Sequence, residues 1–328
     1  MEALVFAAVV EEWGATPVYT EIAEPEERDG AVVATVEASA LTNLTRALVS
    51  GTHYASKEVP LPAVPGFDGV ARLADGRRVY GTSLAPHGMM AERTLVGTAG
   101  LVDIPEAVDS VTGAAVPNPG ISAWTALSYA ANVRQGDRVL ILGATGVTGS
   151  MAAQLAKNVF GAGRVVVAGR DSGRLDWLRA AGADDAIAMR DEDLAARVGA
   201  LHAERPFDAV LDYLWGQPAA TTLAALADSH PAAHYHATRF VQIGSIAGDP
   251  IELPSGILRG TGIVLSGVGI GSVPPEVMSN ARTEALPRIF DMVASGELRL
   301  ETATRALRDV EQAWTATEPS GTRVVLVP

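Results

Sequence analysis

The spacing of apolar residues changes twice along the chain and divides it into three regions. In residues 1–117, short apolar runs alternate with Pro/Gly turns, a pattern typical of β-strands. Strands are predicted at Ala3–Val10, Ala31–Ala40 and Arg77–Tyr80, with one helix at Leu44–Ser50. The first region is therefore expected to be rich in β-structure.

Residues 118–285 alternate compact apolar runs with helical segments. Strands are predicted at Val139–Leu142, Arg164–Ala168, Ala209–Leu211, Phe240–Ile243 and Gly262–Val268. Helices are predicted at Ser150–Phe160, Ser172–Ala181 and Pro218–Ala227. Continuously apolar strands that alternate with helices indicate a parallel sheet covered on both faces. This region is therefore predicted to be a doubly wound α/β domain.

The residues after 285 form a short tail, with helices predicted at Leu286–Ser295 and Val310–Thr317 and a strand at Arg323–Val327. A tail of this kind is expected to return and complete the first domain. The predicted division is thus 1–117 with 286–328 for the β-rich domain, and 118–285 for the α/β domain. A length of 328 residues agrees with two domains, because single cores rarely exceed about 250 residues.

Composition removes several classes of function. Apolar residues make up 48% of the chain and charged residues 19%, so it can bury a core. The net charge is −13 with no Lys/Arg-rich run, which argues against binding nucleic acid, a polyanion. There is no cysteine, which excludes disulfides, a thiolate nucleophile and cysteine-ligated zinc.

No secretory or membrane segment is expected. Met1–Val10 is apolar, but no Lys or Arg precedes Arg28, so the basic start of a signal peptide is missing. The uncharged stretch Ser110–Val133 contains Pro117–Gly120 at its centre, which a spanning helix tolerates poorly. We expect a soluble cytoplasmic protein without a membrane partner.

The strongest local signal is a glycine turn at 143–149, between a buried strand and a helix. Glycine at 146 allows close approach of a pyrophosphate, and glycine at 149 allows the helix to pack on the strand. Ala144 replaces the first glycine of GxGxxG. The turn predicts dinucleotide binding; a purely structural turn is the alternative. The candidate cofactor residues are Ala144, Thr145, Gly146, Val147 and Gly149.

The residues after the next strand indicate which nicotinamide dinucleotide is bound. NAD-binding units place an acidic residue about 20 residues past the turn, on the ribose hydroxyls. Here Arg170 ends the strand and Arg174 follows four residues later, and guanidinium groups pair well with a 2′-phosphate. The prediction is NADPH. A solvated arginine at a strand end is the alternative, and Asp171 would oppose a phosphate unless it points away.

With these residues in place, the whole chain resembles the quinone oxidoreductase-like medium-chain dehydrogenases/reductases. The short-chain family is excluded, because none of the six tyrosines has Lys four residues on. The resemblance implies a GroES-like β-rich catalytic domain beside a Rossmann domain. It is carried by the glycine turn and by the segments 40–46, 50–54, 65–69, 120–124, 169–170, 181–184 and 241–245.

The resemblance also implies that this is a zinc-free branch. Zinc-dependent relatives hold the metal with a Cys and with a His-Glu that follows Gly. These places read Leu41–Thr42 and Gly66-Phe67-Asp68 here, which cannot bind zinc as the family does. No metal ligand is therefore expected.

Further site residues are carried over from the family. Ser122 matches the hydroxyl near the nicotinamide carboxamide, and Asn43 and Tyr54 match the wall of the substrate cleft. The segments that flank the nicotinamide in the family match Gly244, Ser245, Val268 and Gly269. Thr42 and Thr45 replace an Asn and an Asp common in relatives, a departure on the substrate side.

Without a Lewis acid, such a site suits quinones and enones, which spread the developing charge and need only hydrogen-bond donors. Asn43 and Tyr54 are the candidate catalytic donors, and Tyr54 is either a proton source or a packing residue. Two other functions stay open: an enoyl-thioester reductase, and an NADPH-binding protein with a structural or regulatory role. The histidines at 230, 234 and 236 are interpreted as a solvated loop. The apolar strand Gly262–Val268 is expected to end its sheet and pair in a homodimer.

Overall fold

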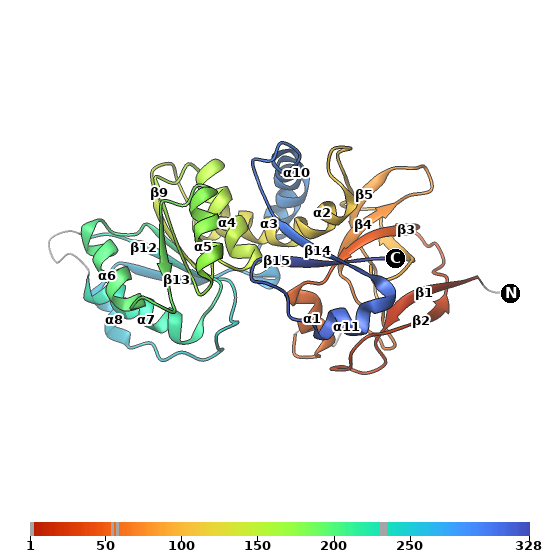
Figure 1. Ribbon diagram of the computed structural model, residues 1–328, viewed down its shortest axis with the longest axis horizontal. Coiled ribbons are helices and arrows are strands. Elements are labelled where there is room, and N and C mark those ends of the chain that lie inside the picture. Colours follow the sequence, from red (N-terminus) through yellow and green to blue (C-terminus); the bar gives the residue numbers. More distant parts are fainter. Residues whose placement is uncertain (1–2, 54–55, 57–58, 230–234) are drawn as a thin grey trace. The chain divides into compact units, whose positions relative to one another are not determined.

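The computed structural model describes residues 3–53, 56, 59–229 and 235–328. The chain forms two compact units (Figure 1). Unit 1 comprises Met1–Asn118 and Arg282–Pro328, and unit 2 comprises Pro119–Ala281. The second boundary lies four residues before the expected one, where a π-helical turn, Ala281–Ala285, leads into helix α10, Leu286–Ala294. Pro287 lies in the first turn of α10, where a missing N–H costs nothing.

Unit 2 is built on a six-stranded sheet in the order β10-β9-β8-β11-β12-β13. All of its strand pairs are parallel. The strands are β8 Arg138–Leu142, β9 Arg164–Gly169, β10 Asp185–Ala188, β11 Ala209–Asp212, β12 Thr238–Gln242 and β13 Ile263–Gly267. This arrangement confirms the predicted α/β doubly wound class.

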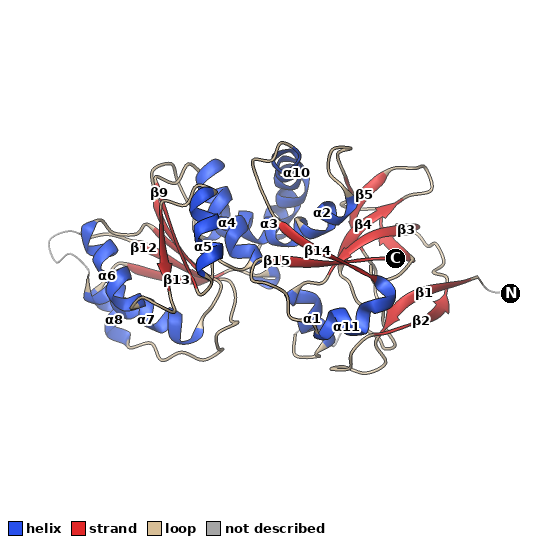
Figure 2. Ribbon diagram, viewed as in Figure 1, coloured by secondary structure: helices blue, strands red, loops and turns tan. Residues whose placement is uncertain are grey.

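Helices cover both faces of this sheet (Figure 2). The helices and short turns of the unit are α3 Pro117–Thr125, the π-turn Ala126–Ala130, α4 Val147–Asn158, α5 Ser172–Ala180, α6 Leu194–Glu204, α7 Gly216–Asp228, α8 Ser255–Gly260, the 3-10 turn Ile270–Ser272 and α9 Pro275–Asn280. On one face, Leu140 and Val166 pack against Val198 of α6 and Leu223 of α7. Because side chains alternate along a strand, Val139 and Ile141 face the other side, and both are fully buried. Burial on both faces explains why these strands read as unbroken apolar runs.

The strand order places a switch point between β8 and β11. From β8 the chain adds β9 and β10 on one side, and then returns to add β11, β12 and β13 on the other. In open parallel sheets, ligands bind outside the carboxyl ends of the strands at this point. The glycine turn follows β8 and therefore lies there.

Unit 1 contains a seven-stranded sheet in the order β14-β15-β3-β4-β5-β7, with β6 paired to β3, and a two-stranded β1-β2 sheet. The strands are β1 Leu4–Val9, β2 Val18–Ala23, β3 Ala31–Ala40, β4 Asp68–Arg72, β5 Arg78–Thr82, β6 Arg93–Gly97, β7 Val102–Asp103, β14 Glu301–Ala306 and β15 Thr322–Val327. Its helices are α1 Asn43–Val49, α2 Ser110–Ala115, α10, a 3-10 turn Leu307–Asp309 and α11 Val310–Thr315.

The tail returns to the first region as expected. Strand β15 pairs antiparallel with β3, so that Val325 lies opposite Ala40. Leu326 and Val310 join Ala8 and Leu41 in one buried cluster. Within the described residues, no helix is long and apolar enough to cross a membrane.

Strand β13 is an edge strand, since its only partner among the described residues is β12. Apolar side chains are exposed on and around it: Val264 is 54% exposed, Leu258 of α8 is 40% exposed and Ile270 is 53% exposed. An exposed apolar edge is a template for pairing with another chain. The homodimer expected from the sequence therefore has a surface of suitable kind.

We predict that the wild-type protein is a dimer and that Val264→Lys makes it monomeric, because a charged side chain on an edge opposes strand pairing. The molar mass by light scattering at micromolar concentration checks this. Val18→Lys is the matched control, since Val18 of β2 is 50% exposed and belongs to unit 1. A monomeric wild type, or a dimeric Val264→Lys variant, contradicts the prediction.

Candidate cofactor site

The glycine turn joins β8 to α4 with a backbone that its glycines permit. Gly143 has φ +79°, a conformation that favours glycine. A Cβ at Gly149 would lie 2.5 Å from the Gly143 carbonyl oxygen, so only glycine lets α4 approach the strand this closely. At Gly146 an added Cβ would meet only that same oxygen, at 3.4 Å, which leaves this backbone accessible.

The start of α4 is suited to an anion. Its N-cap is Gly146, and among the residues that the structure describes no side chain caps the first N–H groups of the helix. Uncapped N–H groups and the positive end of the helix dipole together favour phosphate. A helix start with uncapped N–H groups, directly after the glycine turn, therefore fits the pyrophosphate of a dinucleotide. Val147 is half-buried at this start, while Ala144 and Thr145 are buried beneath the turn.

The turn is fastened to the end of β9. The N–H groups of Gly143 and Ala144 both donate to the Ala168 carbonyl at 3.0 Å. A Cβ at Gly169 would lie 2.3 Å from Thr145 Cγ2, so the end of β9 also needs glycine. Arg170, the next residue, is held beside the turn by these contacts.

The two predicted phosphate-binding arginines have different surroundings. Arg170 is exposed and has no ion-pair partner among the described residues. Arg174 is only 6% exposed, and its guanidinium carbon lies 3.9 Å from the centre of the Trp177 ring. From the sequence, both side chains were expected to reach one phosphate; in the structure Arg174 stacks on Trp177 of its own helix. Arg170 is the exposed cation at this strand end.

Asp171 is the N-cap residue of α5, which accounts for a carboxylate next to Arg170. Its Oδ1 accepts the Arg174 N–H at 3.0 Å and caps α5.

A second exposed arginine, Arg190, was missed by sequence reasoning. Arg190 follows β10, and the residue before it, Met189, donates its N–H to the Gly169 carbonyl at 2.8 Å. The short run Asp185–Ala188 gave too weak a strand signal to place Arg190 beside Arg170.

The turn after β11 is strained and held by one carboxylate. Asp212 is fully buried, and its Oδ1 accepts the N–H groups of Leu214 at 2.9 Å and Trp215 at 3.1 Å. Trp215 has φ 55° and ψ −156°, a region that side chains other than glycine rarely adopt. Burial raises the pKa of the Asp212 carboxyl from 3.8 to about 6, against the lowering effect of these two hydrogen bonds.

The loop after β12 packs on this turn. The N–H groups of Ile243 and Gly244 donate to the Asp212 carbonyl at 2.8 and 3.2 Å. A Cβ at Gly244 would lie 2.8 Å from the Tyr213 carbonyl oxygen. Ser245 follows on the surface. The structure therefore gathers the expected Gly244 and Ser245 at the same sheet edge as the glycine turn.

The remaining cofactor candidates lie after β13 and on α3. The Val268 N–H donates to the Gln242 carbonyl at 2.9 Å, and the Gly269 N–H donates to Ser272 Oγ at 2.9 Å. Val268 is buried and Gly269 is exposed, at the carboxyl end of β13. Ser122 is half-buried on α3.

The substrate-side candidates belong to unit 1. Asn43 is exposed as the first residue of α1. Tyr54 lies outside the described residues, as do His230 and His234. His236 is described, and its Nε2 lies 3.1 Å from the Phe207 carbonyl oxygen.

The places where relatives hold zinc do not fit a metal. Thr42 caps α1 by accepting the Thr45 N–H at 3.0 Å, which explains these two threonines as helix-capping residues. Phe67 offers no ligand atom, and the buried Asp68 accepts the Tyr80 hydroxyl at 2.8 Å. Across residues 3–53, 56, 59–229 and 235–328, no group of three His, Asp or Glu side chains could hold a metal ion.

A buried arginine lies close to this place instead. Arg323 Nη1 donates to the Leu41 carbonyl oxygen at 3.3 Å. Burial raises the pKa of Asp68, and the hydrogen bond from Tyr80 and the positive charge of Arg323 partly oppose that rise. Burial likewise lowers the pKa of Arg323 to about 10, against the effect of Asp68.

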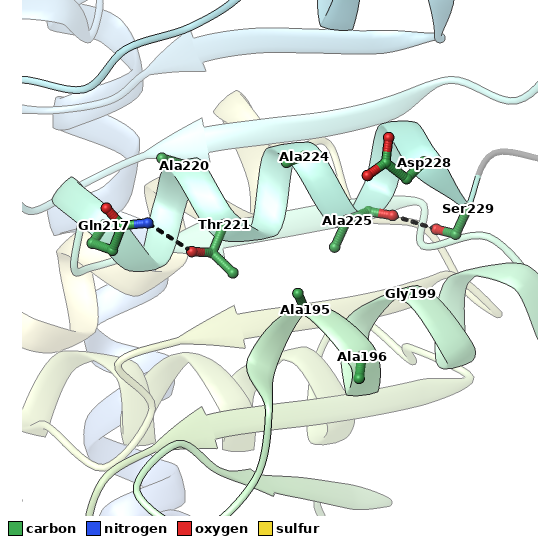
Figure 3. A pocket seen from close by; sticks show the side chains of 10 residues that line it. All are labelled: Ala195, Ala196, Gly199, Gln217, Ala220, Thr221, Ala224, Ala225, Asp228 and Ser229. Carbon is green, nitrogen blue, oxygen red and sulfur yellow. Dashed lines mark hydrogen bonds between the residues drawn. The ribbon is translucent and has the colours of Figure 1, made fainter.

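An open groove of about 500 Å³ lies between α6 and α7 (Figure 3). Its lining is mostly small, including Ala195, Gly199 and Ala224, and its Gln217 bonds Thr221 at 3.1 Å. None of the candidate cofactor residues lines it. The groove is therefore separate from the glycine turn.

Comparison with known proteins shows which proteins the chain is similar to. A family model described as zinc-binding dehydrogenase matches residues 147–289. The trans-enoyl reductase pgmF of Aspergillus terreus is 29% identical over 206 residues, 58% of this chain and 54% of that protein, so this chain spans about half its length. The probable NADPH-dependent quinone reductase tdiC of Emericella nidulans is 26% identical, with 98% and 99% of the two chains covered.

A solved structure shares the fold over nearly the full length. The quinone oxidoreductase of Thermus thermophilus, whose structure was also solved as a complex with NADPH, has a TM-score of 0.79 and 27% identity. The alignment covers 98% of this chain and all of that one, 100%. Together, the fold, the glycine turn and these likenesses support a medium-chain dehydrogenase/reductase. Within that class, the chain is similar to quinone oxidoreductases in particular.

The raised pKa of Asp212 predicts how stability depends on pH. A folded pKa of about 6 against 3.8 means that the unfolded chain ionises first, so stability falls as pH rises from about 4 to about 6 and then levels off. Asp212→Asn removes this ionisation, so its free energy of unfolding relative to wild type should rise by about 2.5 kcal/mol between pH 4 and pH 7. Urea unfolding at both pH values measures the difference.

The control for loss of one charge is Asp249→Asn, because Asp249 is exposed in the same unit. Its free energy of unfolding should follow that of the wild type with pH. A constant difference between Asp212→Asn and wild type at the two pH values would refute the role of Asp212.

Proposed function

We propose that the protein is an NADPH-dependent, zinc-independent oxidoreductase that reduces a conjugated acceptor such as a quinone or an enone. The observation that carries the proposal is the uncapped start of α4, behind the Gly143–Gly149 turn and beside the exposed Arg170. The names of relatives support it, since they include a trans-enoyl reductase and a quinone reductase. NADPH, when bound, supplies the hydride.

The chain's own residues bind and orient the reactants. The N–H groups at the start of α4 hold the pyrophosphate, and Arg170 pairs with the 2′-phosphate. Arg174, stacked on Trp177, adds its charge from a fixed position. Ser122, Gly244, Ser245, Val268 and Gly269 remain our candidates for positioning the nicotinamide.

The chemistry proposed for unit 1 follows from the residues at the positions where zinc-dependent relatives hold their metal. With Asp68 bonded to Tyr80 and Thr42 used as a helix cap, the carbonyl oxygen of an acceptor must be stabilised by hydrogen bonds. Asn43 and Tyr54 are the proposed donors, and either Tyr54 or a water supplies the proton. Conjugated acceptors suit this arrangement, because their developing charge is delocalised.

A panel of acceptors tests the activity and its independence of metal. We expect NADPH oxidation with simple quinones or enones, and equal rates before and after dialysis against a strong chelator, because no residue at the metal places is used as a ligand. Turnover only with enoyl-CoA esters would favour the enoyl-thioester reductase. Cofactor binding without turnover would favour a structural or regulatory protein, and activity restored only by zinc would overturn metal independence.

Arg170 tests the cofactor preference. A charge-assisted hydrogen bond contributes roughly 1.5–3 kcal/mol, which corresponds to about a ten- to hundredfold preference. Arg170→Ala should weaken NADPH binding by about that factor and leave NADH binding nearly unchanged. Fluorescence titration with both cofactors measures this.

Arg259→Ala is the matched control, because Arg259 is exposed on α8 in the same unit. It should leave the affinity for both cofactors unchanged. Equal affinities of the wild type for NADPH and NADH, or equal losses in Arg170→Ala, would make Arg170 only a solvated strand-end residue.

A further inference from the structure

Tyr213 stands at the switch point of the parallel sheet. It directly follows β11, and its N–H donates to the carbonyl oxygen of Leu142, the last residue of β8, at 3.2 Å. A Cβ at Gly143 would lie 3.3 Å from Tyr213 Cβ, and a Cβ at Gly244 would lie 2.8 Å from the Tyr213 carbonyl oxygen. Tyr213 thus lies between the glycine turn and the loop after β12.

The hydroxyl of Tyr213 is buried and has no hydrogen-bond partner among the described residues. The buried hydroxyl of Tyr80 differs, because it donates to Asp68 at 2.8 Å. Leaving a buried polar group unpaired is costly, and nearly all such groups in folded proteins find a partner. Burial raises the pKa of the Tyr213 hydroxyl, so it remains a neutral donor.

The backbone on both sides of Tyr213 is held in place by several contacts. Asp212 caps the turn, and Trp215 is held in a strained conformation. A Cβ at Gly216 would lie 2.6 Å from the Ala247 carbonyl oxygen, so the far end of the turn also contacts the loop after β12. A position fixed by so many contacts indicates a preorganised donor, since strained turns of this kind gather at ligand sites.

The side of β8 on which Tyr213 lies indicates which part of a dinucleotide it would meet. Arg170 follows β9, on one side of β8, whereas Tyr213 follows β11 on the other side. A dinucleotide centred on the glycine turn, with its 2′-phosphate at Arg170, would extend its other half toward β11. That half carries the second phosphate and the ribose next to the nicotinamide, both rich in acceptor oxygens.

We propose that Tyr213 is a cofactor-binding residue whose hydroxyl donates a hydrogen bond to the phosphate–ribose segment on the nicotinamide side. The proposal rests on the proposed function, since it takes the ligand to be a nicotinamide dinucleotide. It assigns Tyr213 to affinity for both NADPH and NADH, because the two share this segment.

Tyr213→Phe tests the proposal, because it removes only the hydroxyl. We expect NADPH and NADH to bind about five- to tenfold more weakly, by the same factor for both, as loss of one hydrogen bond implies. The thermal midpoint of the cofactor-free variant should equal or exceed that of the wild type, because an unpaired buried hydroxyl is removed. The increase in midpoint on adding NADPH should be smaller than in the wild type.

Tyr80→Phe is the matched control, since its hydroxyl is already paired in unit 1. It should lower the midpoint of the cofactor-free protein and leave both affinities unchanged. A Tyr213→Phe variant that binds as the wild type does, or whose cofactor-free midpoint falls, overturns the proposal, because the hydroxyl then bonds water or protein. A wild type that binds neither cofactor contradicts the proposed function itself.

Discussion

The buried carboxylate of Asp212 is the interaction on which the carboxyl edge of the parallel sheet depends. Its side chain accepts the N–H groups of Leu214 and Trp215, and its carbonyl accepts those of Ile243 and Gly244. One residue therefore fixes both the turn after β11 and the loop after β12. Burying a carboxylate is unfavourable, and the raised pKa records that cost. In return, the hydrogen bonds of Asp212 hold the strained turn at Trp215 in place.

A second buried polar group organises unit 1, at the place where zinc-dependent relatives hold their metal. Asp68 is paired with Tyr80, and Arg323 donates to the Leu41 carbonyl while its charge acts on Asp68. Asp68 and Thr42 therefore already have hydrogen-bond partners inside the protein. Because Asp68 and Thr42 are already engaged, the proposed function takes the hydrogen-bond donors for an acceptor from other residues, and on that proposal conjugated substrates are favoured.

The sequence was most informative where a single physical cause produced the pattern. Burial on both faces made β8 an unbroken apolar run, and the need for close approach put glycine at 149, so the α/β fold and the glycine turn could both be predicted. The strand β14, Glu301–Ala306, is largely polar and exposed, and β10 has only four residues. Neither strand therefore shows a pattern of apolar residues from which it could be predicted. The division of the chain was expected near residue 286 because a helix was predicted to begin at Leu286, although helical structure continues through the preceding π-turn, Ala281–Ala285.

Side-chain roles were harder to predict than the fold, for a physical reason. Arg170 lies just before α5 and Arg174 lies in its first turn, yet Arg174 is buried against Trp177 whereas Arg170 is exposed. Tyr213 gave no sequence signal, because an unpaired hydroxyl exists only once the surrounding chain has folded. Arg170 and Tyr213 lie on opposite sides of β8, one toward β9 and the other after β11. Groups that share no contact contribute free energies that nearly add. Selectivity for the 2′-phosphate and affinity for the dinucleotide as a whole can therefore be set by separate residues along one sheet edge.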